Sequence, residues 1–271
     1  MIKQAIIPLA GLGTRLLPLT SVLPKELLPI NGKPGLEYIL DECLSCGIKE
    51  IILIISERKK IIKKYFHNDA FFKKMIKEKK KNKELKLKYS KIKKFKKMVK
   101  FVYQNSPRGT GDAVLKCQRF IKSDHFLLLL PDDLIIKKNC SLSMMKLHNQ
   151  HNSSVIASKK VKKNEVSRWG ILKLKKFSKD NFFIRDVIEK PTIKSSPSNY
   201  AVIGRYILPA KIFKILKKQK PGQNGEIHIT DAIRTLIRQK NKFIGHVFAG
   251  KYLDCGTMKG YINSNKEISK L

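Results

Sequence analysis

Two glycines separated by one residue, Gly11 and Gly13, come directly after an apolar stretch at the start of the chain. A tight glycine turn at the end of a strand aligns backbone N–H groups, and such groups bind phosphate. The spacing does not match the dinucleotide-binding fingerprint, because Leu16 occupies the third glycine position, and no Gly-Lys-Ser/Thr of a P-loop follows. On its own, the turn indicates either a phosphate site or a plain loop.

Two cations close to this turn favour the phosphate interpretation. Arg15 carries a permanently charged guanidinium fork whose geometry suits phosphate oxygens. Lys25 is a second cation in a stretch where Pro24 and Pro29 restrict the backbone. The chemistry that these residues suggest is the binding of a polyphosphate.

A pair of aspartates, Asp132 and Asp133, ends a strongly apolar run. Carboxylate oxygens are good ligands for Mg²⁺, which often binds one or two carboxylates together with substrate phosphates. An aspartate at the end of a strand also caps backbone groups without any metal. From Asp132 alone, both interpretations stay open.

The elements that position these residues are apolar runs alternating with amphipathic helical stretches, a pattern that predicts βαβ units. The expected strands are Ala5–Leu9, Glu50–Ser56, Val99–Tyr103 and Phe126–Leu130. The expected helices are Pro34–Cys46, Glu57–Phe66 and Gly111–Ile121. The fold class predicted from this order is α/β, a doubly wound Rossmann-like mixed sheet.

After Asp133 the pattern changes to shorter strands joined by polar turns. The expected strands are Ser154–Lys160, Gly170–Leu174, Phe182–Glu189 and Ala201–Leu208, followed by a last helix over Lys259–Lys270. We expect residues 1–271 to form one domain with a first half over 1–133. The half over 134–271 is expected to extend the sheet.

The charge balance is strongly basic, with 58 Lys and Arg against 21 Asp and Glu and a formal net charge of +37. Such a charge is typical of nucleic-acid-binding proteins. However, Lys greatly outnumbers Arg and is spread along the chain, whereas nucleic-acid sites favour Arg forks and interleaved aromatic residues. The segment 73–100 alone holds fifteen Lys and two Glu. It is expected to be a partly helical surface insertion, so a solvated surface is favoured and nucleic acid is an unlikely partner.

The remaining reactive side chains are expected to have packing or surface roles. The five cysteines show no disulfide framework, and Cys43 and Cys46 are expected to be packing thiols within a helix. His148 and His151 are expected in a solvent-facing loop, and His228 in a packing role. The chain has no apolar run long enough to span a membrane, so a cytoplasmic protein is predicted.

At the glycine turn and the prolines after it, the sequence resembles the sugar-nucleotide pyrophosphorylases, whose signature combines G-x-G-T-R-x-x-P with a nearby P-K. The stretches Ala10-Gly11-Leu12-Gly13 and Pro24-Lys25-Glu26 are most similar to the branch formed by the bacterial UTP–glucose-1-phosphate uridylyltransferases. Further motifs of the family follow in the same order. They are Gln104–Gly111, Leu130–Asp133, Trp169-Gly170, Glu189–Pro191, Asn199–Tyr206, Gly225–Ala232 and Asp254–Thr257.

The resemblance implies an enzyme that transfers the uridylyl group of UTP to glucose 1-phosphate with the help of Mg²⁺. It also implies that the half over 1–133 binds the nucleotide and that the half over 134–271 supplies the sugar pocket. The implied nucleotide-binding residues are Ala10, Gly11, Gly13, Thr14, Gln104 and Gly109. The implied residues for the sugar phosphate are Gly170, Glu189, Lys190 and Gly204. Arg15, Lys25 and Lys190 are implied as catalytic cations, and Asp132 and Asp254 as metal ligands.

Two departures from the branch limit what the resemblance implies. Asp112 stands where the branch usually has His, and the chain is somewhat short at its C-terminal end. The family forms homodimers or homotetramers partly through peripheral segments, and the same is expected of this chain. The alternatives to a uridylyltransferase are a thymidylyltransferase of the same family and, less favoured, a basic nucleic-acid-binding protein.

Overall fold

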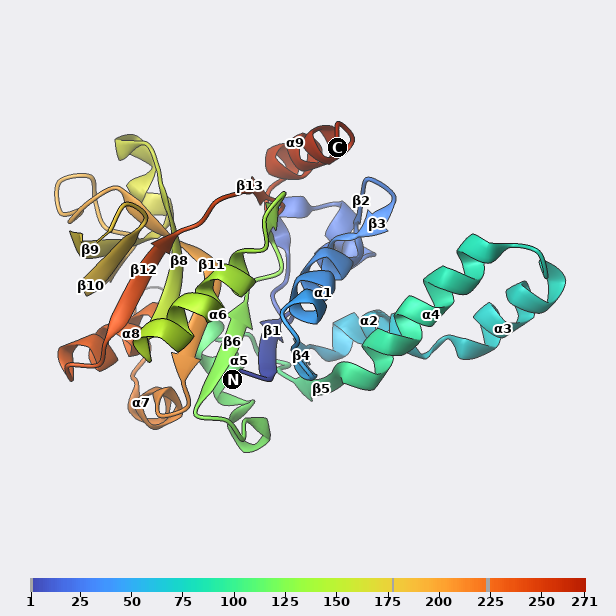
Figure 1. The fold of residues 1–271 in the computed structure, drawn as a ribbon, viewed down its shortest axis with the longest axis horizontal. Helices are drawn as coiled ribbons and strands as arrows, with labels where there is room; N and C mark the ends of the chain where they lie inside the picture. Colours follow the sequence, from blue (N-terminus) through green and yellow to red (C-terminus); the bar gives the residue numbers. More distant parts are fainter. Residues whose placement is uncertain (1, 177, 223–224) are drawn as a thin grey trace.

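Within the residues described by the computed structural model, 2–176, 178–222 and 225–271, nine strands form one mixed sheet (Figure 1). In order across the sheet they are β5 (Val99–Tyr103), β4 (Glu50–Ile55), β1 (Gln4–Pro8), β6 (His125–Leu129), β11 (Tyr200–Pro209), β8 (Ser154–Lys160), β12 (Phe243–Val247), β10 (Asn181–Glu189) and β9 (Gly170–Lys176). Short pairs outside this sheet join β2 (Pro29–Ile30) to β3 (Lys33–Pro34) and β7 (Asp133–Ile136) to β13 (Lys251–Asp254).

The first four strands of that order are parallel. Ile6 on β1 lies opposite Ile52 on β4 and Leu128 on β6, and all three side chains are fully buried. Strands covered on both faces are apolar throughout, which explains the unbroken apolar runs in the sequence. Because parallel strands end at the same edge, the segments that follow β1, β5 and β6 lie close together there.

Beyond β6 the sheet continues with mixed pairings. β11 is antiparallel to both β6 and β8, and β12 is parallel to β8. β10 is antiparallel to β12 and to β9. A further pairing of Ala201 with Ile171 joins β11 to β9, so the far end of the sheet curls back on itself. The predicted fold class, an α/β protein with a doubly wound mixed sheet, is confirmed.

Helices cover both faces of the sheet, and neighbouring residues Ile6 and Ile7 belong to the two different cores. One face packs against α1 (Gly35–Ser45), α2 (Lys60–His67), α4 (Lys83–Met98), α6 (Cys140–His151) and α9 (Met258–Ile268). The other face packs against α5 (Thr110–Leu115), α7 (Ile212–Lys218) and α8 (Ile229–Arg238). Across the described ranges, none of the helices is long and apolar enough to cross a membrane.

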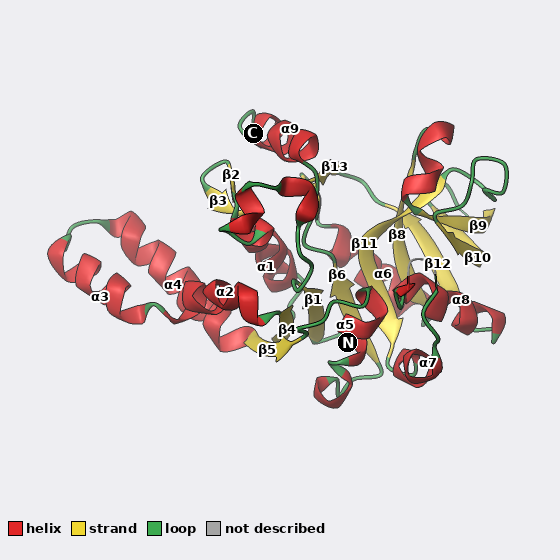
Figure 2. Cartoon of the chain, turned by 180° about the vertical axis from the view of Figure 1, so that it is seen from behind, coloured by secondary structure: helices red, strands yellow, loops and turns green. Residues whose placement is uncertain are grey.

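The lysine-rich segment forms a helical hairpin of α3 (Asp69–Glu78) and α4 that projects from the sheet (Figures 1 and 2). Asn82 caps α4 by accepting a hydrogen bond from the N–H of Leu85 at 2.9 Å. The predicted surface insertion is therefore almost wholly helical before it enters β5. The end of α4 next to the sheet is not a solvated surface, because Ile92 and Phe95 are buried and Phe95 packs in the core.

Several sequence predictions of secondary structure need correction. The helix expected over Gly111–Ile121 ends at Leu115 and is followed by a 3₁₀ turn over Gln118–Phe120. The second half holds α6, α7 and α8 in addition to strands, where only strands, turns and the last helix were expected. Residues 229–238 carry apolar side chains at helical spacing that are buried in α8, so a helical pattern was present but overlooked.

The loop predicted for His148 and His151 was wrong, because both lie at the end of helix α6, but His151 is exposed as predicted. His148 is buried, and its ring lies 4.6 Å from that of His125. The five cysteines are buried free thiols, in agreement with packing roles. His228 is buried directly before α8, as expected for a packing residue.

Candidate active site

In the described part of the chain, two hollows meet at the edge of the sheet where the parallel strands end. The turn hollow, of about 430 Å³, is lined by these predicted site residues: Ala10, Gly11, Gly13, Thr14, Lys25, Gln104 and Gly109. The strand hollow, of about 580 Å³, is lined by Arg15, Gly170, Glu189, Lys190, Gly204 and Asp254. Asp132 lines both hollows. The structure therefore brings every predicted site residue to one continuous region.

The glycine turn has a conformation that requires glycine. Gly13 has a φ of 73°, and a β-carbon there would lie 3.2 Å from the Thr20 side chain. The Thr20 hydroxyl donates a hydrogen bond to the Gly13 carbonyl at 2.8 Å and fixes the turn. Arg15 follows in a short 3₁₀ turn (Thr14–Leu16) with 64% of its side chain exposed. Its guanidinium lies 3.7 Å from Asp132 Oδ2 and lines the strand hollow, where it can meet a ligand.

The loop over residues 104–111 is held against a segment from the second half of the chain. The N–H of Gly111 donates to the Ile227 carbonyl at 2.7 Å, and the Ile227 N–H donates to the Arg108 carbonyl at 2.8 Å. A β-carbon at Gly109 would lie 2.6 Å from the Ile227 carbonyl oxygen, and Gly109 has a φ of 99°. Glycine is therefore required at this position by both backbone conformation and close approach.

Asp132, which lines both hollows, and Asp254, which lines the strand hollow, both lie close to Gly256. A β-carbon at Gly256 would lie 2.8 Å from Asp132 Oδ2 and 3.3 Å from Asp254 Oδ1. The N–H of Gly256 donates to Asp254 Oδ1 at 2.8 Å, and the Cys255 N–H donates to the Asp132 carbonyl at 2.8 Å. Among the described residues, no three or more His, Cys, Asp or Glu side chains gather into a metal site.

Lys25 forms an ion pair with Asp132, with Nζ 2.7 Å from Oδ2. Burial by itself would lower the pKa of Lys25, but the charges of Asp132 and Glu26 raise it overall. Burial would likewise raise the pKa of Asp132, but Lys25 beside it holds that pKa below its usual value. Behind this pair, Lys59 Nζ lies 2.9 Å from both oxygens of the buried Glu26 and 2.6 Å from the Leu9 carbonyl. Four charged groups therefore anchor the segment after the glycine turn.

In the strand hollow, Glu189 is fixed by its neighbours. The Thr230 hydroxyl donates to Glu189 Oε2 at 2.8 Å, and a β-carbon at Gly170 would lie 3.2 Å from the same oxygen. The next residue, Lys190, has a φ of 43°, in the left-handed region that lysine rarely adopts. Its N–H donates to the Trp169 carbonyl at 3.0 Å. Strained backbone of this kind is concentrated at functional sites.

Asp133 is a partly buried carboxylate that lines the strand hollow next to Asp132. It accepts hydrogen bonds from the Gly204 N–H at 2.9 Å and from the Tyr252 hydroxyl at 2.6 Å. Burial and the adjacent charge of Asp132 raise its pKa to about 6. A β-carbon at Gly204 would lie 2.5 Å from Asp133 Oδ2, so Gly204 must be glycine for this hydrogen bond to form.

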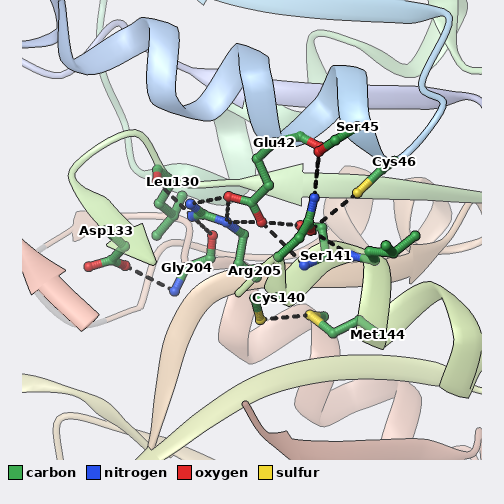
Figure 3. A network of polar contacts seen from close by, with 12 residues as sticks. Glu42, Ser45, Cys46, Leu130, Asp133, Cys140, Ser141, Met144, Gly204 and Arg205 are labelled. Carbon is green, nitrogen blue, oxygen red and sulfur yellow. Dashed lines mark hydrogen bonds and ion pairs between the residues drawn. The ribbon is translucent and has the colours of Figure 1, made fainter. Parts of the chain in front are cut away.

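A buried ion pair stabilises the same region (Figure 3). Arg205 is fully buried, and its guanidinium bonds both oxygens of Glu42 on α1 at 2.9 to 3.1 Å. Its remaining terminal nitrogen donates to the carbonyls of Leu130, at 3.1 Å, and Gly204, at 2.9 Å. Ser141, at the start of α6, also donates to Glu42. The segment that follows β6 and the middle of β11 are thereby tied to α1.

Comparison with protein families identifies the chain. A family model described as nucleotidyl transferase matches residues 4–270. The chain belongs to this nucleotidyl transferase family. A UTP–glucose-1-phosphate uridylyltransferase of Streptococcus pneumoniae is 37% identical over 97% of this chain and 89% of its own length.

Solved structures resemble this nucleotidyl transferase over its full length. A UDP-glucose pyrophosphorylase complexed with UDP-glucose has a TM-score of 0.88 and 36% identity, covering 100% of this chain and 99% of the other. A UTP-bound relative from Acinetobacter baumannii has a TM-score of 0.89 and 32% identity, with 99% and 93% covered.

Sequence reasoning about the nucleotidyl transferase left out several residues that contact the predicted site. Arg168 lies 3.6 Å from Asp254 and lines the strand hollow, and Thr230 positions Glu189. Gly256 leaves room between the two carboxylates. Each of these lies within or directly beside a motif that resembled the family, so the motifs themselves were the signal that could have found them.

Proposed function

We propose that this nucleotidyl transferase transfers the uridylyl group of UTP to glucose 1-phosphate, giving UDP-glucose and pyrophosphate. The observation that carries the proposal is the position of Asp132, where the hollow below the glycine turn meets the hollow formed by β9 to β11. Two substrates bound in the two hollows meet at this carboxylate. The relatives named above are uridylyltransferases, and one of the solved relatives holds UTP and another UDP-glucose.

The turn hollow would hold UTP. Gln104 and Gly109 would contact the uracil edge, and the N–H groups of the glycine turn would contact the phosphates. The residues proposed for the turn contacts are Ala10, Gly11, Gly13 and Thr14. The loop that carries Gly109 is clamped by Ile227, which supports a pocket of fixed width for the base.

The strand hollow would hold glucose 1-phosphate. Glu189 is held by Thr230 through one carboxylate oxygen, which leaves the other oxygen to accept from sugar hydroxyls. Gly170 and Gly204 line the same hollow without side chains and leave room for the sugar ring. Lys190 lies next to Glu189 and would bind the sugar phosphate.

The reaction is an in-line attack of a phosphate oxygen of glucose 1-phosphate on the α-phosphorus of UTP, with pyrophosphate leaving. The nucleophile is already an anion, so the protein needs no general base and must instead hold two anions in line against their repulsion. Lys25 and Lys190 would neutralise the reacting phosphates, and Arg15 would stabilise the departing pyrophosphate. The ion pair with Asp132 keeps Lys25 charged for this role.

Asp132 and Asp254 fit a Mg²⁺ ion that arrives with substrate. Their carboxylates face the same space beside Gly256, and Mg²⁺ is commonly bound by one or two carboxylates together with substrate phosphates. Bound there, the ion would act as a Lewis acid on the phosphate oxygens. Asp132 and Asp254 would orient these oxygens, while Lys25 and Arg168 balance the two carboxylates in the free protein. A homodimer or homotetramer stays a prediction for this chain.

The test of the reaction is a pyrophosphate-release assay that crosses ATP, GTP, CTP, UTP and dTTP with glucose 1-phosphate and galactose 1-phosphate. We expect the highest kcat/KM for UTP with glucose 1-phosphate. A higher kcat/KM for dTTP would replace the proposal by a thymidylyltransferase. Absence of pyrophosphate release with every pair would overturn it.

The test of the metal site uses Asp132→Asn and Asp254→Asn. Each variant should lose at least about a hundredfold in kcat while remaining folded, because a ligand charge is removed where charge develops. Asp180→Asn, which changes an exposed aspartate, is the matched control and should keep its activity. If either site variant turns over at the rate of the unchanged protein over a Mg²⁺ titration, that residue does not hold the ion.

A further inference from the structure

Asp112 is a buried carboxylate that the proposed reaction does not use. It belongs to α5 and is 3% exposed, beside Gln104, which is 4% exposed. Asp112 Oδ2 accepts a hydrogen bond from Gln104 Nε2 at 2.6 Å.

The charge of Asp112 is balanced from one side only. Arg108 places a terminal nitrogen 3.4 Å from Asp112 Oδ1, and 65% of the Arg108 side chain is exposed. The second carboxylate oxygen, Oδ2, faces the Gln104 amide. An ionised carboxylate has only acceptor sites, so Gln104 must present its NH₂ group to Asp112.

This constraint fixes the orientation of the Gln104 amide. With Nε2 turned to Asp112, the carbonyl oxygen Oε1 is the group left for a ligand, and Gln104 lines the turn hollow. Within the described residues, nothing donates a hydrogen bond to Oε1. The turn hollow therefore presents a hydrogen-bond acceptor at this position.

An acceptor here distinguishes between the pyrimidines. Uracil carries a donor, N3–H, between its two carbonyl groups, whereas N3 of cytosine is an acceptor. Gln104 Oε1 would accept a hydrogen bond from N3–H of uracil. With cytosine, the same oxygen would face the lone pair of N3, with no proton between the two acceptors. A buried acceptor left without a donor weakens binding by roughly one to two orders of magnitude, enough to discriminate between substrates.

We propose that Asp112 is a positioning residue that fixes the amide of Gln104 and thereby sets the preference of the nucleotide site for uracil over cytosine. The proposal rests on the proposed function in taking UTP as the ligand of the turn hollow. It goes further by assigning base selectivity to a residue that does not contact the base. The selectivity belongs to the pair, since Gln104 alone could turn either end of its amide toward the ligand.

The test compares UTP and CTP in the unchanged protein and in Asp112→Asn. Asn can accept from Gln104 or donate to it, so the amide is free to turn over and offer Nε2 to cytosine N3. We expect the ratio of kcat/KM for UTP over CTP to fall about tenfold or more, with part of the change arising as a gain in CTP turnover. A defect in packing would lower kcat/KM for UTP and for CTP by the same factor. The ratio would then stay unchanged, and that result would overturn the proposal.

A double-mutant cycle shows whether Asp112 acts through Gln104. Gln104→Ala should lower the same ratio, and Asp112→Asn added to Gln104→Ala should change it no further. Independent effects of the two changes on the ratio would contradict the proposal. Arg108→Gln is the matched control, because it removes the exposed partner of Asp112 and leaves the contact with Gln104 in place, so the ratio should be kept. Asp112→Ser is a smaller neutral variant with the same expectation, for use if Asp112→Asn does not fold.

Calorimetric binding of UTP and CTP without sugar phosphate separates this proposal from the proposed function. If the unchanged protein prefers UTP in binding but releases no pyrophosphate, the proposed function fails while the role of Asp112 can still be measured. If UDP-glucose forms and Asp112→Asn keeps the full preference for UTP, the role of Asp112 fails alone.

Discussion

Lys190 is a residue whose backbone conformation is as informative as its charge. Its φ of 43° lies in the left-handed region, and its N–H is held by the Trp169 carbonyl at 3.0 Å. A non-glycine residue is held in this region only when its surroundings impose it, at a cost of about 1–3 kcal/mol. The strain turns the chain directly after Glu189, so that both residues line the strand hollow.

Replacement of Lys190 by Ala should affect the two substrates differently. We expect Lys190→Ala to raise the KM for glucose 1-phosphate and lower kcat by about a hundredfold, because a charged donor to the reacting phosphate is lost. The Kd of UTP measured by calorimetry should change by less than about threefold, since Lys190 lies outside the turn hollow. Lys194→Ala, four residues away on the exposed surface, is the control. Loss of UTP binding in Lys190→Ala would mean that the assignment of the two hollows is wrong.

Gly256 is the residue at which a single methyl group has the clearest expected effect. A β-carbon there would lie 2.8 Å from Asp132 Oδ2 and 3.0 Å from an Arg15 nitrogen, so charged side chains at the junction must move. We expect Gly256→Ala to lower kcat/KM by about tenfold or more. The Tm should change little, because Gly256 does not have a positive φ. Unchanged kinetics at all Mg²⁺ concentrations would show that the space between the two aspartates is not used.

At the scale of the elements, the Glu42–Arg205 pair connects α1 to the end of β6 and to the middle of β11 (Figure 3). Breaking a buried pair by removing one partner leaves an uncompensated charge and typically costs about 3–5 kcal/mol. We expect Arg205→Met to lose about this much free energy of unfolding in urea titrations. A loss below about 1 kcal/mol would show that water or another group compensates Glu42.

Replacing both partners should separate stability from activity. The double variant Glu42→Leu with Arg205→Met removes both charges, so its stability should recover toward that of the unchanged protein. Its kcat/KM should nevertheless stay low, because the carbonyls of Leu130 and Gly204 lose their donor and the loop that carries Asp132 is less constrained. Full activity in a stable double variant would show that the ion pair only supports the fold.

At the scale of the whole molecule, one sheet supports both hollows, and its β6 strand is central to that arrangement. β6 pairs with β1 on the side of the glycine turn and with β11 on the side of the strand hollow. Asp132 lies in the loop after β6, following Leu130 and Pro131. Local unfolding around β6 would therefore disturb both hollows. His125, the first residue of β6, lies in this region.

The global stability should fall on mild acidification because of His125. Burial lowers the pKa of His125 below 6.5, and His148 on α6 and Lys211 lower it further, while Asp124 opposes them. A histidine whose pKa is lower in the folded state stabilises the fold above its unfolded pKa, and this contribution is lost as the pH falls. We expect the drop in Tm between about pH 7.5 and pH 5.5 to be smaller in His125→Asn. His67→Asn, at an exposed histidine, should retain the full drop. An equal drop in Tm in both variants would show that His125 is not the cause.

The sequence alone was sufficient for what depends on local pattern and on recognisable motifs. The runs that became β1, β4, β5, β6 and β8 were placed within one residue at each end, because buried parallel strands are short apolar stretches. The glycine turn, the two cations that follow it and the aspartate after β6 were visible as residue types at fixed spacing. The family followed from the order of the motifs.

Tertiary structure decided which of these residues contact one another. Glu42 and Arg205 are 163 residues apart, and Lys25 and Asp132 are 107 apart, so no local pattern could pair them. The orientation of the Gln104 amide depends on Asp112, which the sequence showed only as a departure from a motif. The space at Gly256 exists only because β13 pairs with β7 and returns the chain to Asp132. Hydrogen bonds and steric exclusion act over a few ångströms, and only the folded chain brings such distant residues within that range.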